Sequence, residues 1–526
     1  MNIAIIGGGL TGLTSAYELL KSGHRVTVFE KEKTLGGLAG GFKPASRRGA
    51  DASSPRVEAG RGGRPQWKWN LEYFYHHFFT NDTTIISLAK ELGLQNDIII
   101  KRPVTATLFQ NTQKTQNVRE SENSESQIIR VSEYPTIRHS DSPSFLSFPK
   151  VPSFPAIYQL DSPLNLLTFP LLSPIDKLRT ATLLAFCKLN PFWQPLEKIT
   201  AEQLFKTVGG TRAWNILWKP LMLGKFGEYA KGVPASWLWA RIKKRTPSLG
   251  YFRGGFQTLV DALVGAIVKQ GGMIYTNTQV QSIASVIPET RTAIRDLSAQ
   301  PTGFRISPPA GGSSGMTNKK LTNTTFDKIL LTVPSTTAVK LLSPLSNNRT
   351  MQQYNNALLM IPHLFAQTLI LETEKPILDN TYWLNVVDST FPFIAIVAHT
   401  NYMDKKHYGG RHITYIGNYL PDGHPYLKMT KQQLLKKFLP YIQKINPSFR
   451  LPCLAGRRAL SAFCFLFSVP SAQPVHTLNY SKKTPEMKTP IEGICLANLD
   501  SIYPWDRGTN YALELGKKAA TCIHKS

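Results

Sequence analysis

The sequence predicts an α/β fold that combines a parallel sheet of βα units, an inserted domain containing a second sheet, and a helical lobe. Three observations support this prediction. A strand pattern, a glycine turn and a helix pattern follow one another at the start of the 526-residue chain. Helical patterns interrupted by prolines occupy residues 164–245, namely at 175–189, 201–208, 211–223 and 235–244. From residue 363 to residue 420 the patterns become those of strands, and a helix is predicted after them around residues 431–442.

The N-terminal segment has the order of a βαβ unit. The apolar residues 2–6 predict a strand, and residues 14–21 continue the helix that Gly23 ends. Residues 25–29 predict a second strand, which is followed by Glu30. An acid at the end of the second strand can hold the hydroxyl groups of an adenosine ribose.

The turn between the first strand and the helix has the glycine spacing of a Rossmann-like dinucleotide site. Gly7 allows a sharp turn, Gly9 lets the backbone approach a pyrophosphate, and Gly12 lets the helix pack against the strand. Leu10 and Thr11 lie at the helix N-terminus, whose N–H groups and dipole favour phosphate. The chain is therefore predicted to bind a dinucleotide.

A second glycine cluster indicates which dinucleotide it is. Glu30 and Lys31 are followed by a glycine-rich stretch over residues 35–41, which includes Gly36 and Gly37. This arrangement resembles the flavoprotein class of amine oxidases, protoporphyrinogen oxidases, carotenoid desaturases and UDP-galactopyranose mutases. The resemblance implies that the cofactor is FAD and that the Rossmann-like domain is of the glutathione reductase type.

Further segments spread along the chain resemble the same class. Residues 251–259 contain a Gly-Gly pair that opens a helix, and residues 271–280 predict a loop and a strand. In the class, the residue at the position of Val280 contacts the adenine end of FAD through its backbone. Residues 326–334 predict an apolar strand that leaves the cofactor domain.

The C-terminal segment resembles the closing element of these flavoproteins. Residues 493–498 predict a strand, and a loop then leads into a helix over residues 511–521. The resemblance implies that Gly508, Thr509 and Asn510 contact the cofactor and that the helix N-terminus faces the flavin. It also implies that Asn498 bonds the ribityl chain, although the class more often has Gly-Asp where this chain has Ala-Asn.

The predicted domains are interleaved along the chain. The FAD-binding domain is expected at 1–66, 250–350 and 485–526, the substrate domain at 67–110 and 351–484, and the helical lobe at 160–249. Polar, small-residue compositions predict mobile insertions at 45–64, 111–144 and 308–323.

The densest aromatic and histidine segment covers residues 67–80. Residues 77–81 are similar to a histidine-containing segment of the galactopyranose mutases. One hypothesis makes His76 or His77 a catalytic residue beside the flavin, and the alternative is a packing layer with a hydrogen-bonded histidine. Adjacent residues of an extended strand point to opposite faces, so at most one of them should reach the flavin. No metal site is expected, since no further ligands stand at a useful spacing.

The composition limits partners and location. The formal net charge is +27, but without a recognisable reader fold or compact basic stripe no nucleic-acid partner is expected. An anionic membrane surface, anionic substrates and a merely solvated basic surface remain as explanations. The five cysteines show no CxxC pairing and predict buried thiols in a reducing compartment. The strand at Met1 and the absence of a long apolar run predict a cytoplasmic protein, in contact at most with the inner membrane face.

The resemblance implies two kinds of enzyme. The first is an FAD-dependent oxidoreductase that dehydrogenates a C–N or C–C bond of a partly apolar small molecule through flavin N5, of which a carotenoid desaturase would be a variant. The second is an isomerase of a nucleotide-linked sugar, similar to UDP-galactopyranose mutase, in which reduced flavin acts as the nucleophile. A binding protein without flavin is disfavoured because the glycines of the fingerprint are all present.

Overall fold

The computed structural model describes residues 1–44, 66–109, 156–286, 303–307, 324–346, 348–450 and 464–526. The insertions predicted at 45–64, 111–144 and 308–323 lie outside the described residues, as does Cys453. Of the helices that are described, none is both long enough and apolar enough to cross a bilayer.

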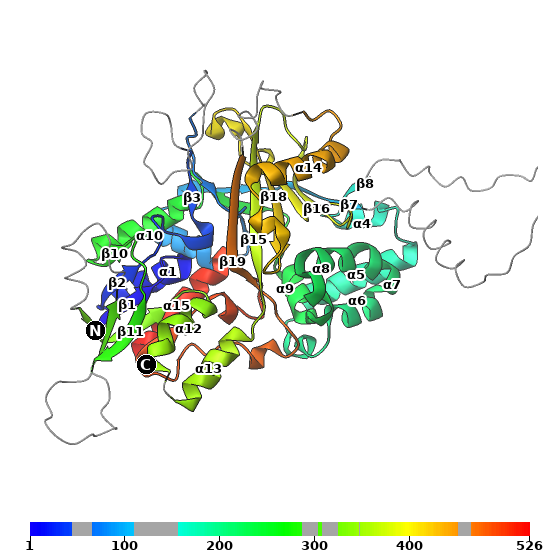
Figure 1. Cartoon of the computed structure of the whole chain (residues 1–526). Helices are drawn as coiled ribbons and strands as arrows, with labels where there is room; N and C mark the ends of the chain where they lie inside the picture. Colours follow the sequence, from blue (N-terminus) through cyan, green and yellow to red (C-terminus); the bar gives the residue numbers. More distant parts are fainter. Residues whose placement is uncertain (45–65, 110–155, 287–302, 308–323, 347, 451–463) are drawn as a thin grey trace, which may run out of the picture.

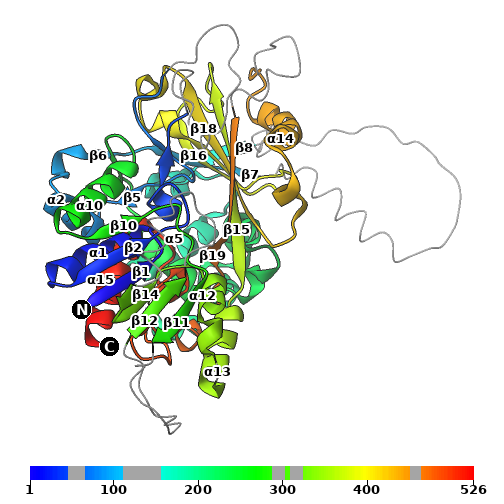
Figure 2. The same cartoon turned by 60° about the vertical axis from the view of Figure 1, so that its left-hand side comes forward.

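A five-stranded parallel sheet is built from distant stretches of the chain (Figures 1 and 2). Its strands, in spatial order, are β10 (Met273–Tyr275), β2 (Arg25–Phe29), β1 (Asn2–Ile6), β14 (Lys328–Leu331) and β20 (Ile494–Leu496). Three helices pack on it, namely α1 (Leu10–Lys21), α10 (Gln257–Lys269) and α15 (Thr509–Lys525). Most residues of β1 are buried, as expected for a central parallel strand. The predicted N-terminal βαβ unit is confirmed.

Smaller elements surround this sheet. A three-stranded sheet contains β11 (Ser282–Val286), β12 (Gly303–Ser307) and β13 (Thr325–Phe326). Two helices follow β14 in the chain, α12 (Ser335–Leu342) and α13 (Arg349–Leu359). The aromatic segment takes part in two short pairings, of β3 (Gly41–Phe42) with β4 (Leu71–Glu72), and of β5 (Phe78–Phe79) and β6 (Ile98–Lys101) with β9 (Leu249–Phe252). Helix α2 (Thr83–Glu91) follows β5.

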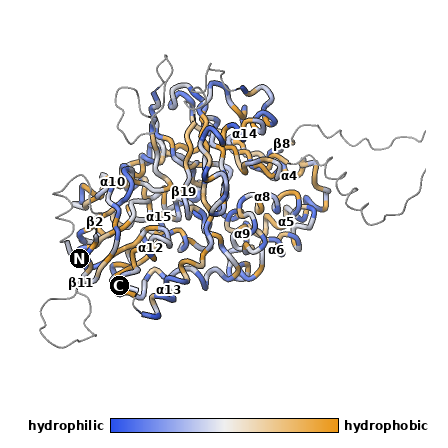
Figure 3. The backbone as a smooth tube through the Cα atoms, viewed as in Figure 1, coloured by the Kyte–Doolittle hydropathy of each residue, from blue (hydrophilic) through white to orange (hydrophobic). Residues whose placement is uncertain are grey.

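A seven-stranded mixed sheet forms the second layer of the molecule. Its order is β19 (Cys464–Pro474), β15 (His363–Thr373), β18 (His412–Leu420), β17 (Ala395–Ala398), β16 (Thr381–Val386), β7 (Val104–Phe109) and β8 (Ala156–Gln159). All pairs are antiparallel except β16 with β7. Helix α14 (Lys431–Ile445) packs against β15 and β19. The predicted strands and following helix are confirmed, and hydrophobic residues run along both sheets (Figure 3).

The helical lobe lies beside the seven-stranded sheet (Figure 1). Its helices are α4 (Pro163–Thr168), α5 (Pro174–Leu189), α6 (Ala201–Gly209), α7 (Thr211–Ala213), α8 (Lys219–Phe226) and α9 (Ala235–Lys244). One helix predicted over 211–223 is interrupted by a π-helical turn at Trp214–Trp218. Pro220 explains the wider turn, because a proline has no N–H to donate and its ring pushes away the preceding turn. Trp214, Trp237 and Trp239 are buried in the core of the lobe.

Candidate functional site

The first glycine turn leaves an open space in front of Gly9. Gly7 has a φ of +117°, and a Cβ on Gly12 would lie 2.0 Å from the Gly7 carbonyl oxygen. Gly9 itself is extended, with a φ of −75°, and no side chain caps the helix that follows it. A Cβ on Gly9 would meet its nearest neighbour, the Cα of Gly37, only at 4.0 Å. A side chain would therefore fill space that the protein backbone lines with N–H groups.

The second glycine cluster closes one side of this space. The Gly36 N–H donates to the Gly8 carbonyl at 2.8 Å, and Gly36 and Gly37 both have positive φ. The two glycine turns thus touch through backbone alone. This geometry fits a pyrophosphate, which needs close backbone approach at the N-terminus of a helix, here at Leu10 and Thr11.

Glu30 lies at the edge of the same loop. One of its carboxylate oxygens accepts from the Gly8 N–H at 2.7 Å and the other from the Glu32 N–H at 2.9 Å. The Glu30 carbonyl accepts from Thr278 at 2.8 Å, which brings the segment before the buried Val280 next to it. Lys31 is exposed, and its Nζ lies 3.4 Å from Oε1 of Glu32 in a surface ion pair. The ribose and adenine contacts expected of Glu30 and Val280 stay predictions.

The N-terminus of α15 faces the same region, because α1 and α15 pack side by side. Helix α15 begins at Thr509, two residues earlier than predicted, and Gly508 precedes it without a side-chain cap. The Thr11 hydroxyl donates to the Ala512 carbonyl at 3.1 Å, and the Ser15 hydroxyl donates to the Gly516 carbonyl at 2.9 Å. The first turns of two helices therefore lie close to each other.

Two predicted cofactor contacts already use their side chains within the protein. Asn498 donates to the Val333 carbonyl at 3.1 Å and to Ser335 at 3.0 Å, and its oxygen accepts from a backbone N–H. Asn510 accepts from the Ile85 N–H at 3.0 Å and donates to a glutamate of its own helix. The cofactor contacts of Asn498 and Asn510 stay predictions, and they would depend mainly on backbone atoms.

The adjacent histidines have different neighbours. His76 donates from Nδ1 to the Phe74 carbonyl at 2.5 Å, and its ring centre is 5.6 Å from that of Phe256. Nδ1 of His77 is 3.3 Å from the Tyr382 hydroxyl. Burial lowers the pKa of His76 to about 4 and that of His77 to about 3. Both imidazoles are therefore neutral near pH 7, which limits them to exchanging hydrogen bonds rather than supplying a positive charge.

Glu72 was not singled out from the sequence. It is buried, it accepts from the Tyr251 hydroxyl at 2.8 Å, and it accepts from the Phe256 N–H at 2.7 Å. Burial raises its pKa to about 7. Glu72 thereby fixes the turn at Gly255, whose φ is +93°. The sequence signal was an acid within a run of aromatic residues. Burial of such a carboxylate without a cation costs folding free energy, so its presence there is unusual.

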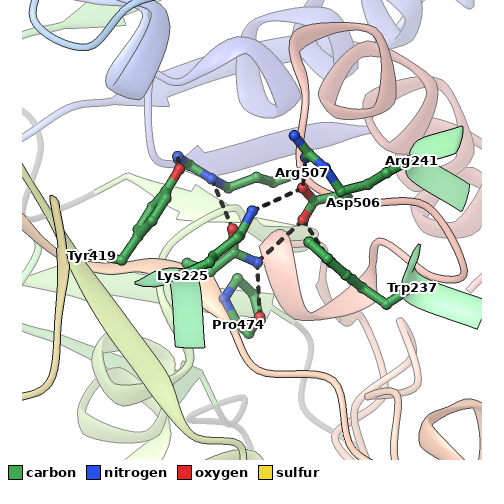
Figure 4. Close-up of polar contacts among 8 residues, drawn as sticks. Lys225, Trp237, Arg241, Tyr419, Pro474, Asp506 and Arg507 are labelled. Carbon is green, nitrogen blue, oxygen red and sulfur yellow. Dashed lines mark hydrogen bonds and ion pairs between the residues drawn. The ribbon is translucent and has the colours of Figure 1, made fainter. Parts of the chain in front are cut away.

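A basic cluster, Lys225, Arg241 and Arg507, was also missed (Figure 4). Lys225 and Arg241 come from α8 and α9 and form ion pairs with Asp506, whereas Arg507 donates to the Tyr419 hydroxyl. The sequence signal was the Asp-Arg pair that directly precedes the predicted C-terminal helix in an aromatic loop. Lys225 and Arg241 lie 281 and 265 positions before Asp506, so these two partners could not be identified without the fold.

Comparison with known proteins agrees with the resemblance stated from the sequence. A family model described as flavin containing amine oxidoreductase matches residues 10–524. Zeta-carotene desaturase of Zea mays is 30% identical over 101 residues, which are 19% of this chain and 14% of the desaturase. The matched segment therefore spans only a small part of that relative.

Two solved structures match the whole chain in fold. A protein assigned as a protoporphyrinogen oxidase from Exiguobacterium sp. 255-15 is 14% identical, with a TM-score of 0.63, over 100% of this chain and 98% of that one. A reduced UDP-galactopyranose mutase is 12% identical, with a TM-score of 0.62, over 100% of this chain and 95% of that one. At such identities the similarity shows the fold alone. The predicted fold class and the predicted flavoprotein class are confirmed.

Proposed function

This chain belongs to the flavin containing amine oxidoreductase family, and from that premise we propose that it dehydrogenates a C–N or C–C bond in a partly apolar small molecule. It is a flavin oxidoreductase with FAD as its cofactor. The observation that supports this proposal most directly is the open space in front of Gly9, which two glycine turns and the N-terminus of α1 frame.

Different residues of the chain would contact different parts of the cofactor. The N–H groups at Leu10 and Thr11 would hold the pyrophosphate, and Glu30 would hold the ribose. The N-terminus of α15 places a positive dipole end where the flavin ring is expected. A bound flavin would supply the hydride-accepting chemistry, so no serine or cysteine nucleophile of the chain is required. Neutral His76 would orient the substrate through a hydrogen bond.

The test is spectroscopic. Purified protein should show a flavin spectrum, become reduced under anaerobic photoreduction, and reoxidise on exposure to oxygen or another acceptor. Partly apolar amines, porphyrinogens and polyenes should then be screened for anaerobic flavin bleaching, which reports the reductive half-reaction alone. Failure to bind FAD would exclude the whole proposal. Flavin that no such substrate reduces, but whose reduced form isomerises a nucleotide sugar, would favour the mutase-like alternative, which the fold match to a mutase also supports.

We further propose that the helical lobe contacts an anionic membrane surface. Large apolar side chains are exposed on α4 and α5, among them Leu167 at 64%, Ile175 at 70%, Leu178 at 69% and Leu189 at 80%. Those of α5 recur at helical spacing and thus share one face. Exposed basic residues of the lobe and the net charge of +27 complement anionic headgroups, so a lipid bilayer is the occupant that fits this face.

Cosedimentation with vesicles of phosphatidylcholine and phosphatidylserine at low salt tests this proposal. The Ile175→Ser/Leu178→Ser variant should lose most of its binding. The matched control is Leu359→Ser/Met360→Ser, which removes two apolar side chains of comparable exposure outside the lobe and should bind normally. Absence of binding by the unaltered protein, or equal binding by both variants, would contradict a membrane contact at α5.

A further inference from the structure

The basic cluster gathers three cations around one carboxylate. Lys225 donates to Asp506 Oδ2 at 3.1 Å, and Arg241 donates to the same oxygen. The other oxygen, Oδ1, accepts from the indole N–H of Trp237 and from the amide of Gln473, each at 3.2 Å. Figure 4 shows Lys225, Trp237 and Arg241 converging on Asp506 from different elements. The carboxylate is therefore fully used by the contacts that it already makes.

Arg507 is the third cation of the cluster, and it forms no ion pair with Asp506. Its guanidinium donates to Gln473 at 3.2 Å and to the Tyr419 hydroxyl, not to the carboxylate. In the described part of the chain, Asp506 is the only carboxylate that forms an ion pair with the cluster. Three positive charges and one negative charge leave an excess of two positive charges in a half-buried place. A clamp that only joined the lobe to the loop would not need Arg507.

The positive charges of the cluster also lower the pKa values of two groups beside them, Asp506 and Tyr419. Burial would raise the pKa of Asp506, but the charges of Lys225, Arg241 and Arg507 outweigh it and hold that pKa far below its ordinary value. Burial would likewise raise the pKa of Tyr419, yet Arg507 and Lys225 lower it. A potential that favours a phenolate also favours a bound anion.

The position of the cluster connects it with the flavin site. Arg507 lies two residues before the start of α15, and Tyr419 lies on β18 of the seven-stranded sheet. Burial is the main cause of the low pKa of His76, and the charge of Arg507 lowers it further. Aromatic rings support the cations, with Lys225 over Trp237 at 4.8 Å and Arg507 over Tyr419 at 5.1 Å.

We propose that Lys225, Arg241 and Arg507 form an anion subsite that binds a carboxylate or a phosphate of the substrate beside the N-terminus of α15. This inference rests on the proposed function, since it names the chemical class of the molecule to be oxidised. Lys225, Tyr419 and Arg507 are only half-buried, so a ligand can reach them. Arginine favours planar or tetrahedral oxyanions because its donors form a rigid fork. The substrate is accordingly an amphiphilic anion.

The test compares three ligands with the same apolar chain on the FAD-loaded protein. Hexanoate, hexyl phosphate and 1-hexanol are titrated, and binding is followed by the change in flavin absorbance and by the rise in unfolding temperature. At least one anion should bind about tenfold or more tightly than the alcohol, as expected for hydrogen bonds between charged groups. Whether hexanoate or hexyl phosphate binds more tightly identifies the group. Equal affinity for all three ligands would overturn the proposal.

Charge removal within and outside the cluster provides the matched comparison. Arg507→Gln should lose the preference for the anion, and Lys225→Met should weaken it, so two independent substitutions test the same site. Arg179→Gln removes an exposed arginine of α5 that donates to backbone carbonyls, and it should keep the preference. An unchanged preference in Arg507→Gln and Lys225→Met would refute the subsite. Because no turnover is needed, an anion preference in a protein that oxidises nothing would count against the proposed function alone.

Discussion

Replacing Gly9 by alanine separates cofactor binding from folding. The backbone at Gly9 is extended, and the added Cβ would lie 4.0 Å from its nearest neighbour, so the folded protein can accept it. The loss of glycine freedom in the unfolded chain should even raise the stability of the apoprotein by about 0.4–1 kcal/mol. In the loaded protein the same methyl group would occupy the space that the pyrophosphate is predicted to need. Losing one charge-assisted hydrogen bond costs about 1.5–3 kcal/mol, or about 10–100-fold in affinity.

The assay is a titration of deflavinated protein with FAD, alongside thermal unfolding without FAD. Gly9→Ala should unfold at the same temperature as the unaltered protein, or slightly higher, and bind FAD weakly. Gly265→Ala, where a Cβ meets nothing within 4 Å, should change neither FAD affinity nor fold. Gly12→Ala should lose both stability and FAD, since its Cβ would lie 2.0 Å from a carbonyl oxygen. Gly9→Ala protein that binds FAD as tightly as the unaltered protein would refute the pyrophosphate assignment.

Further substitutions test the surroundings of the site. The free energy of unfolding should fall by about 3 kcal/mol as pH rises from 4.5 to 7, because the folded pKa of Glu72 is raised to about 7 and its ionisation favours the unfolded chain. Urea unfolding of Glu72→Gln should lack this loss. His76 has a folded pKa of about 4, so stability should fall as pH drops from 6.5 to 4, and His76→Gln should be less acid-sensitive in the same assay. Gly417→Ala would place a Cβ 2.9 Å from the Tyr75 ring and should cost about 1–3 kcal/mol in thermal unfolding. A flat pH profile or an unchanged melting temperature would contradict the respective argument.

The parts of the molecule that sequence could predict are those with local physical causes. The strands and the helix around Gly7 and Gly12 follow from hydrophobic period and glycine spacing, and the structure confirms them. The break in the lobe was not predicted, although Pro220 lies inside the helix predicted over 211–223, where a proline kinks or ends a helix. Asp506 and Glu72 owe their properties to burial and to partners far away in the chain. Neither burial nor long-range pairing has a local sequence signal.

The helical lobe connects the proposed membrane contact with the proposed anion subsite. Its outer helix α5 exposes Ile175 and Leu178, whereas α8 and α9 supply Lys225 and Arg241, and α5 packs against α9. An amphiphilic anion taken from a lipid surface would therefore meet the apolar face first and the basic cluster next. Substitutions should then affect the two features separately. Ile175→Ser/Leu178→Ser should lose any increase in the rate of substrate oxidation that vesicles cause, while keeping its affinity for the dissolved anion. Arg507→Gln should lose the affinity for the anion while keeping vesicle binding. If each substitution abolished both properties, the membrane face and the anion subsite would not be separate, and the argument for two distinct sites on one lobe would fail.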